Sequence, residues 1–208
     1  MKLYGNAIST CTRKVLCTLA EKGAQLEFIP IDIMKGEQKN PDYMQAHQPF
    51  GVVPALDDDG FKMYESRAIM RYLDDRLPGP KLTPADPKER ARMDQWTSVE
   101  YSYFSGPAMR IVREKIFHPM RGLPVDAKTV DAGKAELTRT LEVLENQLAN
   151  QPYLAGHELS LADIGYLPYI EYLFAAQEGE LISARPHVAT WWQRTSERSS
   201  WQSLPRVG

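Results

Sequence analysis

The sequence predicts a protein of two parts, a mixed α+β half followed by an all-helical half. Strand-like and helical patterns alternate over residues 1–77, and strand-like patterns are absent after them. Between the halves, residues 78–87 (PGPKLTPADP) contain four prolines and one glycine, a density that cannot continue a helix and so indicates a linker. We therefore expect a first domain over 1–77, a linker over 78–87 and a second domain over 88–208.

Four segments of the first half have strand-like sequences: 2–5, 26–31, 53–56 and 61–64. A helix is expected between the first two strands, so they should be parallel, with a right-handed crossover. Pro30 has no backbone N–H, which confines the second strand to a sheet edge or places Pro30 at its end. The run Asp57-Asp58-Asp59-Gly60 separates the last two strands and is typical of an antiparallel hairpin. These signals predict a mixed four-stranded sheet with helices on its faces.

Three helices are expected in this half. The first covers 12–22 and carries apolar residues at helical spacing, and Gly23 suits the position after its end. A short helix is expected over 41–47. The third starts at Ser66, whose side-chain oxygen suits an N-cap, and its apolar face consists of Ile69, Met70, Leu73 and Leu77.

Helix signals continue through the second half. Asp86, Pro87 and Glu89 supply an N-cap, a first-turn proline and a capping-box acid. The run Ser160-Leu161-Ala162-Asp163 is a second helix start of the same kind. A core-facing stripe is formed by Leu137, Leu141, Leu144 and Leu148.

Composition excludes several classes of protein. Lys plus Arg number 25 and Asp plus Glu number 27, and a net charge of −2 argues against general nucleic-acid binding. Two cysteines exclude a disulfide scaffold and a four-cysteine zinc site, and the scattered histidines form no metal motif. No apolar run is long enough to span a bilayer, and the N-terminus has no signal-peptide stretch. We expect a cytoplasmic protein with reduced thiols and no metal.

The loop after the first strand carries the first candidate site. Ser9 and Cys11 lie at the start of the following helix, where the helix N-terminus favours anions and lowers thiol pKa values. A hydroxyl at this point can donate a hydrogen bond to a thiolate. The competing interpretation is that Ser9 or a neighbouring threonine only caps the helix.

Two further loops of the first half are candidates. A cis bond between Val53 and Pro54 would turn the backbone of Val53 toward a ligand, whereas a trans bond would only start a strand. Glu65 and Ser66 suit the two ends of an α-amino acid zwitterion. The Glu65 carboxylate would bind the ammonium group of the ligand, and the Ser66 hydroxyl with the helix N-terminus would bind its carboxylate. The alternative is again a helix cap.

Aromatic residues of the second half form the last candidate. Tyr101 and Phe104 are three residues apart, so they are expected to share a helix face, with Phe117 further on. Together they suit the lining of an apolar pocket. Ordinary core packing is the competing interpretation.

The order of these features resembles the cytosolic glutathione transferases over essentially the whole chain, and most of all their phi-like class. The segments that carry the resemblance are MKLYGNAISTCTRKVL, KGEQKNPDYMQAHQPFGVVPAL, MYESRAIMRYL and LSLADIGYLPYI. The phi-like pattern has a serine at the position of Ser9, followed by Thr12-Arg13, and FESRAI where this chain has YESRAI. The resemblance implies a thioredoxin-like N-terminal domain that binds glutathione and an all-helical C-terminal domain that forms the electrophile site.

The resemblance also implies a role for each matching residue. Ser9 would donate its hydroxyl to the sulfur of glutathione and stabilise the thiolate. Val53, held by cis-Pro54, would pair through its backbone with the cysteinyl part of glutathione. Glu65 and Ser66 would bind the γ-glutamyl end.

The glycyl carboxylate of glutathione would, by the same resemblance, be reached by Gln38 and Lys39. Here the chain departs from the phi-like pattern, because Gln38 stands where these enzymes usually have His and Val52 where they usually have Gln. Each departure removes a polar contact. A lost hydrogen bond costs about 0.5–1.5 kcal/mol, so glutathione is expected to bind roughly threefold to tenfold more weakly.

Cys11 leaves a second chemistry open. The bacterial beta-like class of these transferases uses a cysteine near this point, and Cys11 matches it when the helices are aligned by the run Glu21-Lys22-Gly23. Such a cysteine would form mixed disulfides with glutathione and favour thiol–disulfide oxidoreductase or peroxidase chemistry. Ser9 is the first choice for the catalytic residue and Cys11 the alternative.

The resemblance implies a detoxifying, cytoplasmic homodimer that conjugates glutathione, its co-substrate, to small apolar electrophiles. It implies no metal, nucleic-acid or membrane partner. A non-catalytic ligand carrier on the same fold is the other alternative, motivated by the departures at Gln38 and Val52.

Overall fold

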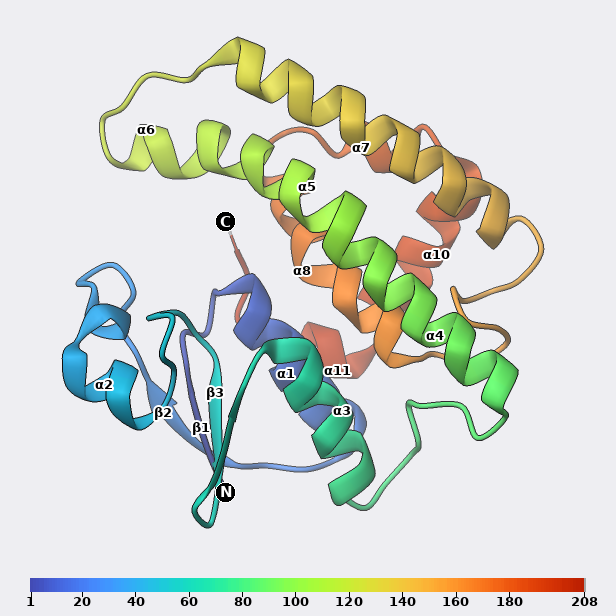
Figure 1. Ribbon diagram of the computed structural model, residues 1–208. Helices are drawn as coiled ribbons and strands as arrows, with labels where there is room; N and C mark the ends of the chain where they lie inside the picture. Colours follow the sequence, from blue (N-terminus) through green and yellow to red (C-terminus); the bar gives the residue numbers. More distant parts are fainter. Residues whose placement is uncertain (208) are drawn as a thin grey trace. The chain divides into compact units, whose positions relative to one another are not determined.

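The computed structural model describes residues 1–207. Contacts divide the chain into two compact units, the first made of Met1–Leu82 together with Ser199–Arg206 and the second of Thr83–Arg198 (Figure 1). The boundary between Leu82 and Thr83 lies within the proline-rich stretch. The return of Ser199–Arg206 to the first unit differs from the division expected from sequence, which assigns that segment to the helical domain.

The first unit is built on a four-stranded mixed sheet. Its strands are β1 (Lys2–Gly5), β2 (Glu27–Pro30), β3 (Ala55–Asp58) and β4 (Phe61–Tyr64), in the spatial order β2-β1-β3-β4. As predicted, β1 and β2 are parallel, β3 and β4 form an antiparallel hairpin, and β2 is an edge strand. The third strand begins at Ala55, two residues later than predicted, since Pro54 cannot donate to a sheet ladder.

The β3–β4 hairpin turns at Asp59 and Gly60. Both residues have positive φ angles, of 51° and 97°, as a two-residue turn that follows the twist of the strands requires. The Asp57 carboxylate accepts a hydrogen bond of 2.7 Å from the backbone N–H of Gly60 and so stabilises the turn.

Helices α1 (Thr10–Glu21) and α3 (Ser66–Arg76) pack against each other and against the sheet, whereas η1 (Glu37–Lys39) and α2 (Pro41–Ala46) follow β2. The core of this unit includes Leu3, Val15, Ile69 and Leu73, all fully buried. One sequence-based prediction is wrong. The N-cap of α3 is Glu65 and not Ser66, because Glu65 has a non-helical φ of 72° and helical geometry starts only after it.

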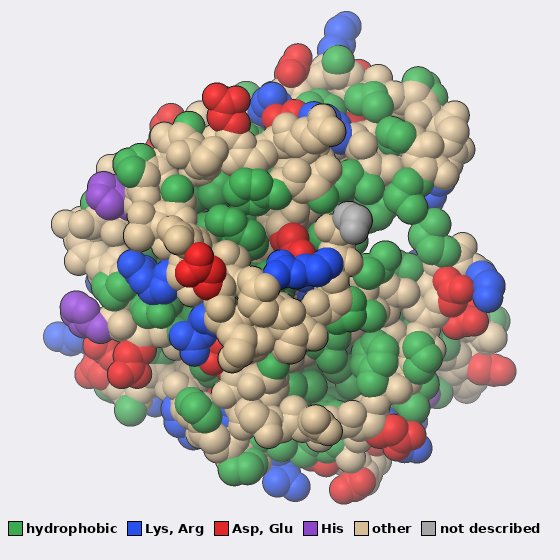
Figure 2. All heavy atoms as spheres, turned by 180° about the vertical axis from the view of Figure 1, so that it is seen from behind, with side chains coloured by type: hydrophobic (Ala, Val, Ile, Leu, Met, Phe, Trp, Pro, Cys, Tyr) green, Lys and Arg blue, Asp and Glu red, His purple; other side chains and the backbone are tan. Residues whose placement is uncertain are grey.

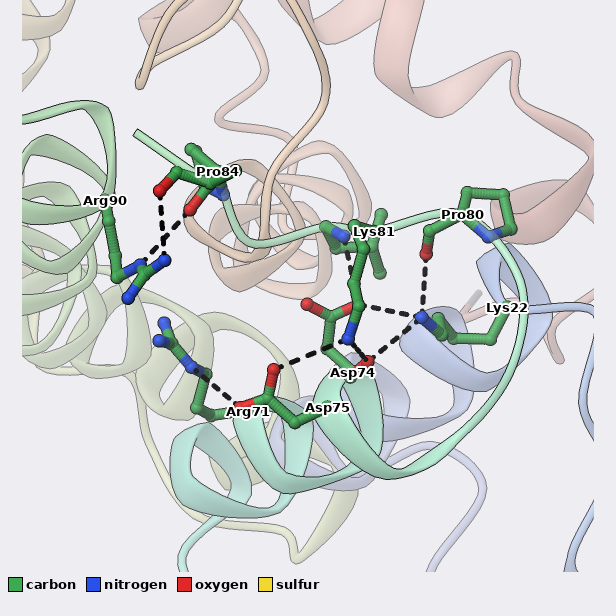
Figure 3. A network of polar contacts seen from close by, with 10 residues as sticks. Lys22, Arg71, Asp74, Asp75, Pro80, Lys81, Pro84 and Arg90 are labelled. Carbon is green, nitrogen blue, oxygen red and sulfur yellow. Dashed lines mark hydrogen bonds and ion pairs between the residues drawn. The ribbon is translucent and has the colours of Figure 1, made fainter. Parts of the chain in front are cut away.

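A buried ion pair joins the C-terminal ends of α1 and α3. Nζ of Lys22, the C-cap of α1, lies 3.0 Å from Asp74 Oδ1 in α3, and both side chains are fully buried. The same ammonium donates to the carbonyl of Pro80 at 2.8 Å, and Asp74 Oδ1 accepts from the backbone N–H of Leu82 at 2.9 Å (Figure 3). A Cβ on Gly79 would lie 2.4 Å from the carbonyl oxygen of Lys22, so this close approach requires glycine. The pair therefore fixes both helices and the chain that follows α3.

Within Thr83–Arg198 the structure describes helices and no strand. They are α4 (Pro87–Val99), η2 (Glu100–Phe104), α5 (Ser105–Val112), η3 (Arg113–Phe117), α6 (His118–Met120), α7 (Ala127–Leu148), α8 (Leu161–Ala175), α9 (Glu180–Ser183) and α10 (Pro186–Ser196). The elements η2 and η3 are π-helical turns that join α4, α5 and α6 into one continuous run (Figure 1).

Local signals in the sequence located these helices well. Asp86 caps α4 as predicted, accepting from the backbone N–H groups of Lys88 and Glu89 at 2.9 and 3.0 Å. The predicted leucine stripe of α7 is buried. At the start of α8, Asp163 accepts hydrogen bonds from the backbone of Ser160 and from Trp191 Nε1, both at 2.9 Å, so one buried carboxylate ties α8 to α10.

The Lys22–Asp74 pair yields a prediction on stability. Lys22→Met keeps most of the side-chain volume but leaves Asp74 as a buried charge without its ammonium, which typically costs about 3–5 kcal/mol. Lys35→Met is the matched control, because the Lys35 side chain is 78% exposed beside Asp32, and such changes usually stay within about 0.5 kcal/mol. Denaturant unfolding of both variants checks this prediction, and equal stabilities would contradict the importance of the pair.

Candidate active site

Ser9 lies in a braced loop between β1 and α1. Its backbone N–H donates to the Asn6 carbonyl at 3.0 Å, and the Asn6 side chain donates to the Ile31 carbonyl at 3.1 Å. Thr12 Oγ1 accepts from the Asn6 N–H at 3.3 Å. A Cβ on Gly5 would lie 2.6 Å from the Thr12 methyl group, so Thr12 packs directly on the strand that precedes the loop. These contacts fix the position of Ser9.

Ser9 is the N-cap of α1, as the competing sequence interpretation expected. Its Oγ accepts from the backbone N–H of Thr12 at 3.5 Å, a long contact. A hydroxyl carries one donor hydrogen and two acceptor lone pairs. Capping uses one lone pair and leaves the O–H free to donate, so the structural and the chemical interpretations of Ser9 are compatible.

The two cysteines differ in their surroundings. Cys11 is half-buried in the first turn of α1, two residues after Ser9, whereas Cys17 is buried in the body of the helix. Both are free thiols. Cys11 therefore stays the alternative catalytic residue, and Cys17 belongs to the core.

The segment before β3 is held from α2. The Val53–Pro54 peptide bond is cis. Tyr43 Oη donates to the Val52 carbonyl at 3.0 Å, and burial, followed by the nearby Tyr4, raises the pKa of Tyr43 to about 12, so the phenol stays a neutral donor. Sequence reasoning did not identify Tyr43, because a single tyrosine on a short helix gives no signal.

Gln38 and Lys39 lie in the η1 turn, against the same segment. Lys39 Nζ donates to the Phe50 carbonyl at 3.3 Å and Gln38 Nε2 to the Ile33 carbonyl at 3.4 Å. Gln38 Oε1 is buried and has no hydrogen-bond partner among the described residues. Gly51, with φ of 63°, permits this packing, because a Cβ there would lie 2.9 Å from the Lys39 side chain.

Glu65 and Ser66 open α3. Ser66 is almost fully buried, whereas the Glu65 side chain is exposed. The φ of 72° at Glu65 lies in a region that residues other than glycine rarely adopt. Such conformations cost of order 1–3 kcal/mol and concentrate at ligand sites, and here the conformation places a carboxylate beside the free N–H groups of a helix N-terminus.

The register of the sheet brings these three loops together. Tyr4 on β1 pairs with Ala55 on β3, and Ala55 pairs with Tyr64 on β4. Ser9 follows the first of these positions, cis-Pro54 precedes the second and Glu65 follows the third. The Ser9 hydroxyl, the backbone before cis-Pro54 and the Glu65–Ser66 pair therefore lie at the same end of these three strands. This arrangement suits a small peptide with a thiol.

The aromatic candidates of the second unit are not brought to one surface. Tyr101 is 67% exposed, whereas Phe104 is fully buried with its ring 4.8 Å from that of Tyr166. The expectation that the two share a helix face is wrong, because η2 is π-helical and residues three apart no longer lie one above the other. Phe117 is partly exposed and packs edge-on against Tyr172.

Other site classes gain no support. Among residues 1–207, no group of three His, Cys, Asp or Glu side chains is placed to hold a metal ion. In the same range no helix combines the length and apolarity that crossing a membrane requires. Figure 2 shows basic side chains interspersed with acidic ones on the face that it draws, with no continuous basic surface among the described residues there.

Comparisons with known proteins identify the family of this chain. Residues 3–81 match the family model described as glutathione S-transferase, N-terminal domain, and residues 103–199 match glutathione S-transferase, C-terminal domain. Glutathione S-transferase F10 of Arabidopsis thaliana is 39% identical over 207 residues, which cover 98% of this chain and 95% of that protein.

Solved structures give the same result. Glutathione transferase F2 from Populus trichocarpa superposes with a TM-score of 0.92 at 38% identity, over 97% of this chain and 95% of that one. Glutathione S-transferase I from maize, solved with an atrazine glutathione conjugate, has a TM-score of 0.89 at 35% identity, over 97% and 94% of the two chains. The resemblance and the predicted fold are confirmed: the chain belongs to the glutathione S-transferase family and to its phi class, with a thioredoxin-like N-terminal domain followed by a helical C-terminal domain.

Proposed function

We propose that this transferase activates glutathione through Ser9 and conjugates it to small apolar electrophiles. The observation that carries the proposal is the free O–H of Ser9 at the N-terminus of α1. The thiol loses its proton to solvent, and the hydroxyl donates to the resulting thiolate. The sulfur lone pair forms the new S–C bond with the electrophile, and the leaving group departs with the electron pair of the bond that breaks.

The free energies involved are sufficient. A thiol with a pKa of about 8.5 is only a few per cent ionised at pH 7, and lowering that pKa by about two units requires about 2.7 kcal/mol. A hydroxyl donor to a charged sulfur supplies about 1.5–3 kcal/mol. The N-terminus of α1 adds up to about 1 kcal/mol.

The rest of the glutathione molecule is proposed to extend along the end of the sheet where these loops lie. We place the γ-glutamyl end at Glu65 and Ser66 and the cysteinyl backbone at Val53, beside cis-Pro54. The glycyl carboxylate lies near Lys39, with Gln38 contributing a neutral contact. The buried and unpartnered Oε1 of Gln38 is an acceptor, and therefore does not attract a carboxylate. Val52 offers only an exposed apolar side chain, so affinity for glutathione is expected to be moderate.

The electrophile is proposed to be apolar. Tyr101 and the partly exposed Phe117 of the helical domain are the residues that we assign to its binding, whereas Phe104 is fully buried and belongs to the core. The atrazine conjugate held by the maize relative supports an aromatic or heteroaromatic substrate class. A detoxifying role in the cytoplasm fits this chemistry and the two free thiols.

We also propose a homodimer, in which the first unit of one chain packs on the helical unit of its partner. Phe50 is 66% exposed, with Val52 and Tyr64 exposed beside it. In the helical unit, Tyr103 is 63% exposed. Aromatic residues of this kind are enriched in protein interfaces.

Replacement of Ser9 tests the catalytic assignment. Ser9→Ala and Ser9→Gly both remove the donor, worth about 1.5–3 kcal/mol, so kcat at pH 7 should fall about 10- to 100-fold while KM for glutathione changes little. The Ser9→Gly variant keeps most of the capping stability that Ser9→Ala loses. If the two variants lose activity equally, the loss is due to the missing hydroxyl donor and not to the missing cap. The Cys11→Ala enzyme should conjugate glutathione at the wild-type rate. Loss of activity in Cys11→Ala with retention in Ser9→Ala would favour the thiol–disulfide alternative.

Replacement of Glu65 separates strain from binding. Glu65→Gly and Glu65→Ala both lose the carboxylate, so KM for glutathione should rise about tenfold or more. The free energy of unfolding of the Glu65→Gly variant should nevertheless be about 1 kcal/mol higher than that of Glu65→Ala, since glycine adopts positive φ without strain. Calorimetry and steady-state kinetics check the two effects, and an alanine variant as stable as the glycine variant would refute the strain.

The dimer is tested at Phe50. Light scattering should give twice the chain mass of 23.6 kDa, and Phe50→Ala should raise the dimer dissociation constant at least about tenfold. Phe61→Ala is the control, because Phe61 is a 54% exposed phenylalanine on the hairpin of the same unit. A wild-type mass near that of one chain would refute the dimer.

A further inference from the structure

The C-terminal segment Ser199–Arg206 returns to the glutathione-binding unit and contacts the helix that carries Ser9. Within it, α11 (Ser199–Gln202) packs against α1 (Figure 1). Trp201 is fully buried there, and the guanidinium carbon of Arg13 lies 4.3 Å from the centre of its ring. Ser200 Oγ donates to the Glu21 carboxylate near the other end of α1. The segment thus holds α1 at both ends.

Arg13 occupies a special place on α1. It follows Ser9 by four residues, so the two side chains lie on the same face of the helix. Its backbone N–H donates to the Ser9 carbonyl at 2.9 Å and closes the first turn. Its side chain is fully buried, although a cation in the first turn of a helix is disfavoured by the macrodipole and by desolvation. Burying a cation here is therefore costly unless neighbouring groups compensate for it.

The ring of Trp201 compensates for part of this cost. Cation–π contacts with tryptophan are at their strongest when the pair is desolvated. Trp201 Nε1 finds no acceptor among the described residues, so the contact of its face with Arg13, and not a hydrogen bond at its edge, orients the ring.

The other charged residues of α1 and of α3, which packs on it, are Lys14, Glu21, Lys22, Arg67, Arg71, Asp74, Asp75 and Arg76.

We propose that Arg13 is a positioning residue for Ser9, and that Trp201 of the C-terminal segment holds Arg13 in place. The inference rests on the proposed function of Ser9. A positive charge buried one turn behind the hydroxyl favours negative charge in front of it, and the closed first turn keeps the hydroxyl aimed at the sulfur. The C-terminal segment is therefore a working part of the glutathione site and not only a tail.

The test compares Trp201→Leu with Trp201→Phe in the full-length protein. Both shorten the side chain, but only phenylalanine keeps an aromatic face for Arg13. Thiolate formation by bound glutathione is measured across pH from the thiolate absorbance. At pH 6.5, Trp201→Leu should hold about three- to tenfold less thiolate than wild type, whereas Trp201→Phe should stay within about twofold. KM for glutathione should change little in both variants.

Controls separate this effect from a loss of stability. Trp96→Leu removes a buried tryptophan from the helical unit, and should lower the melting temperature without changing thiolate formation. If Trp201→Leu does not fold, Arg13→Met replaces it, with the same expected loss, and Arg13→Lys should recover part of it. A Trp201→Leu or Arg13→Met enzyme with the wild-type thiolate profile would overturn this inference alone. A wild-type enzyme that forms no more thiolate than free glutathione would overturn the proposed function and this inference with it.

Discussion

One buried ion pair joins the two helices that carry most of the proposed glutathione site. Lys22 and Asp74 join the C-terminal ends of α1 and α3, whose N-terminal ends carry Ser9 and the Glu65–Ser66 pair. The two helices also pack against each other, so the ion pair and this packing together restrict the distance between their N-terminal ends. The sheet register then adds the third loop, because Ala55 pairs with Tyr4 on one side and with Tyr64 on the other. The site is thus built by the framework, and the loops contribute only the functional groups.

Several groups in this site perform two tasks. The Ser9 oxygen caps α1 and still has a hydrogen to donate. Glu65 starts α3 in a strained conformation, and that conformation presents its carboxylate beside the helix N-terminus. Cis-Pro54 begins the run into β3, and Tyr43 holds the preceding carbonyl from outside the sheet. Each of these groups therefore serves the local fold as well as the proposed chemistry.

The sequence predicted what local signals encode. The Asp86 cap, the leucine stripe of α7 and the hairpin at Asp59-Gly60 are set by neighbouring residues, and the structure has all three. Features set by distant contacts were not predictable. Glu21 and Ser200 are 179 positions apart in the chain, so nothing local announces that the C-terminal segment returns to the first unit. The prediction that Tyr101 and Phe104 share a helix face failed for a related reason. It assumes the periodicity of an α-helix, whereas the chain forms a π-helical turn there. The proposed site residues were assigned from their order along the chain and not from any single motif.

We expect the hydroxyl of Ser9 to lower the pKa of the thiol of bound glutathione. The most direct measurement is a pH titration of the thiolate absorbance of glutathione bound to the wild-type enzyme, with free glutathione beside it. The expected midpoint lies about two pH units below that of free glutathione, whose thiol pKa is about 8.5. Bound glutathione that titrates at the same pH as the free peptide would contradict the account.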